Sequence, residues 1–405
     1  MTVSHAASAL PTLDEIRAAS DLLEGVVLRT PTERSTAISA IARAEVVMKM
    51  ENRQHTNSFK VRGAYVKIAG LDAEQRARGV IAASAGNHAQ GVAYAARAFG
   101  VPATIVMPFG TPFGKVRRTQ EYGGRVVLEG ARLAESLEIA QQLAERDGLA
   151  YVSGYDDPAI VAGAGTVALE MLADAPDLDV LIVPVGGGGL IGGAALAAKG
   201  LRPDLRIVGA QSASFQAGEA TVAEGIAVKE YGALNARIVA EFVDEMLPVD
   251  EASIETAIYA LLDREKTLVE GAGAAGIAAL LQYPERFKGL RVGTILSGGN
   301  IDPSLLASII ARAGLRDGRM AKLRTQMLDI PGGLAKVAGI IARHGANVIE
   351  VVHARTHTDL PAKSMELETT IELRSPDDLA DILSDIRATG LPCDIAPIDR
   401  YGPGV

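Results

Sequence analysis

The chain has 405 residues, of which 48% are hydrophobic and 22% charged, and its formal net charge is −9 at neutral pH. This composition predicts a globular protein of two or three domains, and the acidic balance disfavours nucleic acids and anionic membranes as partners. The one cysteine, Cys393, excludes an intrachain disulfide and a cysteine-based zinc cluster. We expect a cytoplasmic location, because a single thiol suits a reducing compartment and neither a signal pattern nor a membrane-spanning apolar run is evident.

The first three quarters of the chain alternate short apolar runs with amphipathic stretches. Helical periodicity is clear at 87–99, and Asp157-Pro158 is typical of a helix start. Because strands alternate with helices, this part predicts an α/β fold with parallel strands. The predicted strands are 46–50, 79–84, 103–107, 125–128, 180–185, 206–210 and 291–296.

The pattern changes near residue 320, where a strand, helix, strand, strand, helix, strand order predicts a ferredoxin-like α+β domain. We therefore divide the chain into residues 1–318, with a smaller subdomain at about 50–155, and residues 319–405. A role of the second part in stability or dimerisation and a role in sensing a small ligand both stay open. Its predicted elements are 322–330, 333–343, 347–356, 365–373, 377–389 and 393–399.

Lys60 lies in the segment 56–63 (TNSFKVRG), at the start of a predicted helix. A cation is unfavourable at a helix N-terminus, so this local conflict indicates a function. Taken alone, a solvated surface lysine is the more common explanation. A lysine that forms a Schiff base would need a buried pocket that lowers the pKa of its amine.

The segment 84–91 (SAGNHAQG) follows a predicted strand and opens a helix. Backbone N–H groups at a helix N-terminus suit a substrate carboxylate, and side chains can add further donors. The alternative is an ordinary capped turn, and a histidine in this pattern is more typical of a packed or surface side chain. The candidate substrate-binding residues are Ser84, Ala85, Gly86, Asn87 and His88.

The segment 186–190 (GGGGL) follows an apolar strand, and consecutive glycines let backbone amides close around a phosphate. Gly187, Gly189 and Gly192 also fit a dinucleotide-binding pattern, but the next strand ends at Gln211, where that pattern expects an acid. A phosphate monoester therefore fits better than a dinucleotide. The turn 297–300 (SGGN) could bring the Ser297 hydroxyl to a ring nitrogen, or it is a common glycine turn.

In this order, the motifs resemble those of the threonine dehydratase family, within the fold type II pyridoxal-phosphate enzymes, over about residues 10–315. The resemblance implies two parallel-sheet α/β subdomains and pyridoxal 5′-phosphate as coenzyme. It implies that Lys60 forms a Schiff base with the coenzyme and moves the Cα proton of the substrate, while Phe59 packs against the ring. Asn87 would contact the ring 3′-oxygen, Ser297 the ring nitrogen, and Glu270 would lie near the ring. The residues implied for phosphate binding are Gly186, Gly187, Gly188, Gly189 and Leu190.

The same resemblance implies elimination of water from a hydroxy amino acid, with L-threonine giving 2-oxobutanoate and ammonia. Serine racemases carry a serine directly before Gly-Asn-His, where this chain has Ala85, which has no proton to donate. This difference favours dehydration over racemisation. Serine dehydratase, serine racemase, hydroxyaspartate dehydratase and a catalytically inert amino-acid-sensing regulator stay open as alternatives.

Two positions depart from the family pattern. Asn57 stands where many relatives have glycine, which concerns the geometry of the Lys60 loop, and Gln211 stands where metal-dependent relatives carry a glutamate. We therefore predict no metal site. The segments 328–334 (LDIPGGL) and 345–348 (GANV) resemble an ACT domain, which implies an amino-acid effector and pairing within a homodimer or homotetramer.

Overall fold

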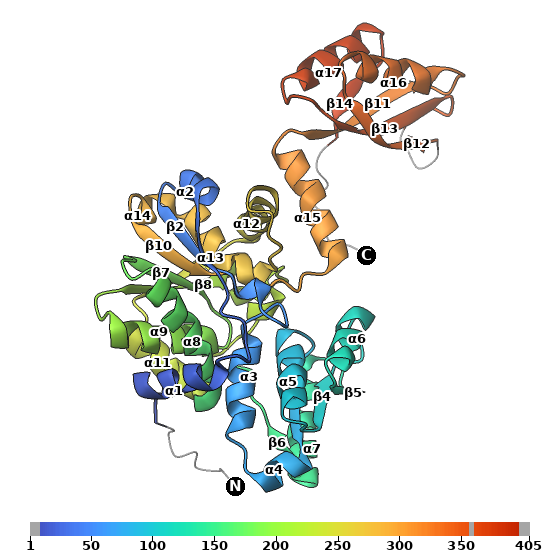
Figure 1. The fold of residues 1–405 in the computed structure, drawn as a ribbon. Helices are drawn as coiled ribbons and strands as arrows, with labels where there is room; N and C mark the ends of the chain where they lie inside the picture. The colour runs from blue at the N-terminus through green and yellow to red at the C-terminus, as the bar shows by residue number, and fades with distance from the viewer. Residues whose placement is uncertain (1–8, 356–359, 397–405) are drawn as a thin grey trace. The chain divides into compact units, whose positions relative to one another are not determined.

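The computed structural model describes residues 9–355 and 360–396 (Figure 1). The chain divides after Asp302 into two compact units, and each has its own hydrophobic core. The predicted boundary at 318/319 lies one helix further along, because α15 (Pro303–Arg316) belongs to the second unit and contacts β11 (Met320–Leu328). In the described part of the chain, no helix combines the length and apolar character needed to cross a bilayer.

A six-stranded sheet forms the larger half of the first unit, in the order β1-β2-β10-β7-β8-β9. All neighbours are parallel except β1, which runs antiparallel to β2. Every residue of β7 is buried, as expected for a parallel sheet covered on both faces. The strands are β1 (Thr32–Ser35), β2 (Glu45–Lys49), β7 (Val180–Pro184), β8 (Arg206–Ser212), β9 (Glu245–Val249) and β10 (Arg291–Ile295).

Helices cover both faces of this sheet. On one face α8 and α9 pack on each other, with α1 against α8 and α11 against α9; on the other, α13 contacts β7, β8 and β10, and α12 packs on α13. The helices are α1 (Leu13–Leu23), α2 (Thr36–Ala42), α8 (Pro158–Asp174), α9 (Gly189–Leu201), α10 (Ala213–Gln216), α11 (Ala233–Phe242), α12 (Glu251–Arg264), α13 (Gly271–Gln282) and α14 (Pro284–Phe287), with 3-10 turns η1 (Glu51–Arg53) and η2 (Glu224–Ile226).

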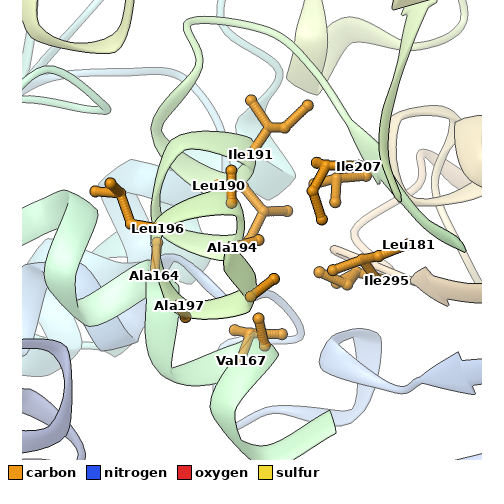
Figure 2. Close-up of a cluster of buried hydrophobic side chains, with 14 of the residues drawn as sticks. Ala164, Val167, Leu181, Leu190, Ile191, Ala194, Leu196, Ala197, Ile207 and Ile295 are labelled. Atoms are coloured by element: carbon orange, nitrogen blue, oxygen red, sulfur yellow. The ribbon is translucent and has the colours of Figure 1, made fainter. Parts of the chain in front are cut away.

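The core of this half is built from alanine and branched aliphatic side chains. Leu181 points from β7 toward α9, whereas its neighbour Ile182 lies on the α13 side, near Gly276. Figure 2 shows side chains of α8 and α9 gathered opposite Leu181, Ile207 and Ile295. Small residues such as Ala164 let the helices approach closely, and this packing holds α9 on the sheet.

A four-stranded parallel sheet forms the smaller half, in the order β5-β4-β3-β6, and lies within residues 50–155, the range predicted for a smaller subdomain. α5 packs against β3 and β4, and α7 contacts the same strands and β6. The elements are β3 (Val80–Ala83), β4 (Ala103–Met107), β5 (Arg125–Leu128), β6 (Ala150–Tyr151), α4 (Ala73–Arg78), α5 (Asn87–Ala98), α6 (Phe113–Glu121) and α7 (Leu133–Asp147).

Helix α3 (Lys60–Ala69) joins the two halves, because it packs on α5 of the smaller half and on α8 of the larger half. At the α3–α8 crossing, a Cβ atom added to Gly63 would lie 2.8 Å from the Ile160 carbonyl oxygen. One added to Gly163 would lie 2.7 Å from the Gly63 Cα atom. The two helices therefore meet backbone to backbone, and any larger residue at this crossing would push them apart.

The second unit has the predicted ferredoxin-like order, with an antiparallel sheet β12-β13-β11-β14 and two helices. Leu323, Leu367 and Ile371 lie in its core. The predicted ends of two strands, at 356 and at 397–399, lie outside the described residues. Besides β11 the elements are β12 (Asn347–Ala354), β13 (Ser364–Glu372), β14 (Cys393–Ile395), α16 (Gly333–Arg343) and α17 (Asp378–Ala388).

Candidate active site

Lys60 is the first residue of α3, and backbone contacts fix it against the turn that follows β10. The N–H of Phe59 donates to the Ser297 carbonyl oxygen at 3.1 Å, and Ser58 pairs with Gly298 in an antiparallel bridge. The Lys60 Nζ atom donates to the Gly154 carbonyl oxygen at 2.6 Å and lies 5.0 Å from the centre of the Phe59 ring. Two of the four motifs are thus in contact.

Burial lowers the pKa of the Lys60 amine to about 8, although the Glu270 carboxylate opposes this effect. Nζ donates its hydrogen bond to a neutral carbonyl, which stabilises a positive charge less than a carboxylate would. An amine with a pKa near 8 is partly unprotonated near neutral pH. This is the condition under which a lysine acts as a nucleophile or a base.

The substrate-loop candidates follow β3 and open α5. Ser84, Ala85, Gly86 and Asn87 are partly exposed, so a ligand can reach them. Gly86 is the N-cap of α5 and makes no side-chain cap, although its N–H donates to the Ser84 hydroxyl at 3.2 Å. The first-turn N–H groups of α5 therefore have the arrangement that binds a carboxylate.

Asn87 connects this loop to the turn after β10. Its Nδ2 donates to Glu270 Oε1 at 2.6 Å, and its Oδ1 accepts from Asn300 Nδ2 at 2.8 Å. An amide nitrogen carries two N–H groups, and within residues 9–355 and 360–396 the Asn87 Nδ2 donates to Glu270, so one N–H can still meet a ligand. Burial raises the pKa of Glu270 to about 7, and the bond from Asn87 only partly offsets this.

The side chain of His88 points away from the loop. Its ring is buried, and Nε2 lies 2.9 Å from the Val152 carbonyl oxygen. Burial lowers the pKa of His88 to about 4, with a smaller contribution from the positive charge of Lys60, so the ring is neutral and Nε2–H donates to Val152. The backbone N–H of His88 stays in the first turn of α5, whereas its ring contacts the segment that follows β6.

The four glycines stand between β7 and α9, where other residues would not fit. Gly188 has φ +91° and is the N-cap of α9, without a side-chain cap. A Cβ atom on Gly187 would lie 2.4 Å from the Tyr155 ring, and one on Gly189 would lie 2.9 Å from the Tyr155 carbonyl oxygen. The loop therefore places backbone amides without side chains at the N-terminus of a 13-residue helix, an arrangement that binds anions.

Short contacts link all four motifs. Lys60 bonds to Gly154, and the next residue, Tyr155, covers the glycine loop. The Lys60 turn bonds to Ser297, and Asn300 bonds to the substrate loop through Asn87. A lysine, a glycine loop, a helix-opening loop and a buried serine are thus assembled in one place.

Residues 23–298 match the family model described as pyridoxal-phosphate dependent enzyme. This chain belongs to that family. Residues 322–390 match the ACT domain model, which confirms the second assignment. Pyridoxal phosphate is therefore the coenzyme, as the sequence predicted.

Individual relatives agree on the family and differ in substrate. The chain is 44% identical over 375 residues to the L-threonine ammonia-lyase of Thermotoga maritima, covering 89% of this chain and 93% of that protein. It is 39% identical to the L-threo-3-hydroxyaspartate ammonia-lyase of a Pseudomonas species, covering 74% and 99%. The structure of maize serine racemase matches with a TM-score of 0.71 and 33% identity, covering 76% of this chain and 99% of that one.

The residues present fit the coenzyme of the pyridoxal-phosphate dependent enzymes. The glycine loop leaves its backbone amides without side chains at the N-terminus of α9, and burial lowers the pKa of the Lys60 amine. Ser297 is 5% exposed at the end of β10, which suits a neutral partner for a ring nitrogen. Lys60, residues 186–190 and Ser297 could therefore hold the aldehyde carbon, the phosphate and the ring.

Both departures from the family pattern have local explanations. Asn57 has φ +53°, a left-handed conformation that asparagine tolerates well, and its carbonyl accepts from the Gly299 N–H at 2.9 Å. The loop geometry is thus compatible with asparagine in place of glycine. Gln211 donates to the Tyr231 hydroxyl at 2.8 Å, and within the described residues no group of three or more histidine, cysteine or acidic residues is placed to hold a metal.

Sequence reasoning missed a buried cluster of two cations and two carboxylates behind α3. Arg62 donates to Glu51 at 2.7 and 2.9 Å and to Glu170 at 2.6 and 3.0 Å, and Lys49 bonds to Glu170 at 2.6 Å. Despite burial, these carboxylates raise the pKa of Arg62 above its ordinary value. The sequence did contain one signal for this cluster. Arg62 is a second cation in the first turn of α3, which has no acidic residue there to pair with it.

Proposed function

We propose that this chain is an L-threonine ammonia-lyase, which converts L-threonine to 2-oxobutanoate and ammonia. The observation that carries the proposal is the Lys60 amine, whose pKa burial lowers to about 8 and which short contacts link to the glycine loop and to the helix-opening loop 84–88. The 44% identity to an L-threonine ammonia-lyase supports the choice of substrate.

In this proposal each motif has one task. Lys60 would hold the coenzyme through its amine, and the same amine would remove the Cα proton of the substrate. Residues 186–190 bind the phosphate, Phe59 packs on the ring, and Ser297 meets the ring nitrogen. The N–H groups of residues 84–88 orient the substrate carboxylate, and Asn87 meets the ring 3′-oxygen.

Pyridoxal phosphate, when bound, supplies an electron sink for the pair left at Cα. Lys60 carries the proton removed from Cα, and the β-hydroxyl leaves with a proton as water. Addition of one water to the resulting unsaturated amine gives 2-oxobutanoate and ammonia, so the sum is one threonine for one of each product. The buried side chains around Lys60 limit competing proton exchange with water.

The substrate loop argues against a racemase. A racemase needs a proton donor on the face of the substrate opposite Lys60, and Ala85, the residue at the position of the serine in serine racemases, has none. Because the ammonia-lyase relatives include a hydroxyaspartate enzyme, L-threonine, L-serine and 3-hydroxyaspartate should be compared directly.

The decisive assay measures 2-oxo acid release by the holoenzyme from these three substrates. We expect the highest kcat/KM with L-threonine, and a higher value with 3-hydroxyaspartate or L-serine would contradict the substrate assignment. A purified protein without the yellow colour of a lysine-bound coenzyme would instead favour an inert amino-acid-sensing regulator.

We further propose that the ACT domain binds an amino-acid effector and that the chain acts in the cytoplasm as a homodimer or homotetramer. Support comes from the match of residues 322–390 and the ferredoxin-like sheet. Threonine saturation curves with and without L-isoleucine or L-valine test the effector, and light scattering tests the assembly. Curves that coincide for all amino acids tested would contradict the regulatory role.

A further inference from the structure

Asn235 is a buried side chain of α11 to which neither the motifs nor the proposed reaction assigns a task. It is 0% exposed, and its Nδ2 donates to two backbone carbonyls, those of Gly187 and Tyr155, each at 2.9 Å. Gly187 lies in the glycine loop, and Tyr155 lies in the segment that follows β6. One amide group therefore joins two segments that are 32 residues apart, since 187 minus 155 is 32.

The bond to Gly187 determines how the glycine loop faces its ligand. In a planar trans peptide the C=O and the following N–H point in opposite directions. When Asn235 holds the Gly187 carbonyl, the N–H of Gly188 is turned to the other side, away from Asn235. A Cβ atom on Gly188 would lie 2.8 Å from Asn235 Cβ, so the close approach depends on glycine there.

The bond to Tyr155 connects the same amide to the Lys60 side of the site. The Tyr155 ring covers Gly187, and the preceding carbonyl, that of Gly154, accepts from Lys60. Asp156 Oδ1 in turn accepts from the Asn235 N–H at 3.3 Å, which holds the start of α11 against this segment. Displacement of Asn235 would therefore loosen the loop and the segment together.

The amide has one workable orientation. Both neighbours of Nδ2 are carbonyl oxygens, so a rotated amide would place Oδ1 against two acceptors. Oδ1 is itself buried and has no hydrogen-bond partner within the described residues. A carboxylate at this position would place negative charge against both carbonyls and close to the bound anion.

We propose that Asn235 is a positioning residue for the coenzyme phosphate, which turns the Gly188 N–H toward that phosphate by holding the Gly187 carbonyl. The inference rests on the proposed phosphate role of residues 186–190. It predicts that Asn235 contributes to binding of the phosphate group specifically, and not to binding of the pyridine ring or to the fold as a whole.

The test begins by removing the coenzyme from the holoenzyme. It then compares binding of pyridoxal 5′-phosphate with binding of pyridoxal, which lacks the phosphate. We expect Asn235→Asp to weaken pyridoxal phosphate by about tenfold or more relative to pyridoxal, the size of one lost hydrogen bond plus repulsion. Ala236→Asp adds the same charge at the exposed next position of α11 and should leave the ratio of the two affinities unchanged.

Asn235→Ala removes the donor without adding charge and provides a second variant if Asn235→Asp does not fold. A parallel loss of both ligands, or an unchanged ratio in a folded variant, would overturn the role of Asn235. A wild-type protein that binds both ligands equally would instead overturn the phosphate role of residues 186–190. Phosphorus NMR of the bound coenzyme gives an independent readout, and we expect the resonance to shift in Asn235→Asp and not in Ala236→Asp.

Discussion

The first turn of α3 carries two cations that are withdrawn from solvent, Arg62 completely and Lys60 in part, and the protein surrounds them in opposite ways. Lys60 and Arg62 are two positions apart and therefore face directions about 200° apart around the helix. Arg62 donates four hydrogen bonds to two carboxylates, whereas Lys60 donates to the carbonyl of Gly154. Both side chains are withdrawn from solvent, but the hydrogen-bond partner of Lys60 is neutral and those of Arg62 are charged.

This difference explains why one cation is suited to chemistry and the other to support. The pKa of Lys60 falls to about 8, so its proton can leave, while the carboxylates raise the pKa of Arg62 and keep it charged. A cation withdrawn from water keeps its proton when carboxylates pair with it. With only a neutral partner, its pKa falls and it loses the proton more easily. The following variants test this contrast.

The largest effect is expected for Lys60→Ala. We expect release of 2-oxobutanoate from L-threonine to fall by at least about 10³-fold, because a general base and the coenzyme attachment are both lost. Lys288→Ala removes an exposed lysine and should leave the rate unchanged. Borohydride reduction of the wild-type holoenzyme and peptide mapping should place the coenzyme on Lys60, and a label on another lysine would contradict the site.

Arg62→Leu should destabilise the first unit by about 3–5 kcal/mol, because it leaves the negative charges of Glu51 and Glu170 buried with a single cation, Lys49. Adding Glu51→Gln restores neutrality and should recover part of the loss. Urea unfolding followed by circular dichroism measures both. The matched control is Arg78→Leu, which breaks an exposed pair with Glu74 and should cost less than about 1 kcal/mol. Equal losses at positions 62 and 78 would show that the cluster has no special role.

The lowered pKa of Lys60 predicts a pH dependence of stability in the coenzyme-free chain. Between pH 8 and 10.5 the unfolded chain retains a proton on this amine that the folded chain has released. The free energy of unfolding therefore rises with pH across this window, relative to a Lys60→Met variant that lacks the group. Unfolding curves at pH 7.5, 9 and 10.5 measure the difference, and a parallel pH profile for the two proteins would be inconsistent with a lowered pKa.

The smallest effect is expected for Ala85→Ser, which adds a proton donor facing the substrate from the side opposite Lys60. We expect detectable D-serine formation from L-serine, with dehydration of L-threonine changed by less than about tenfold. Chiral chromatography of the reaction mixture measures the D-enantiomer. Absence of D-serine from a folded, active variant would show that Ala85 is not what prevents racemisation.

The sequence predicted the elements that are strongly periodic or fully apolar. β4 and β5 begin and end as predicted, and the ferredoxin-like order of the second unit is confirmed. β1, β6 and β9 were missed. β1 is four mostly polar residues, β6 has two residues, and β9 contains Pro248, so none shows a clear apolar run.

The residues of the candidate site also fall into those that the local sequence reveals and those that only the fold reveals. Motif residues such as Lys60, Asn87 and Ser297 could be found from local order, since each follows a strand or opens a helix. Asn235 and Glu170 could not, because their partners lie 48 to 121 positions away in the chain, as 170 minus 49 is 121. Glu51 lies 11 positions from Arg62, but its side chain matches no motif. The His88 ring could not be placed either, because only the fold shows Val152 beneath it.

The crossing of α3 and α8 at Gly63 and Gly163 limits how this enzyme can be altered. Neither position can accept a side chain without separating the helices. Lys60 is on α3, the helix that carries Gly63. A saturation library should therefore tolerate as little variety at these two glycines as at Lys60 itself. The partly exposed loop after β3 has room for substitutions that the α3–α8 crossing lacks.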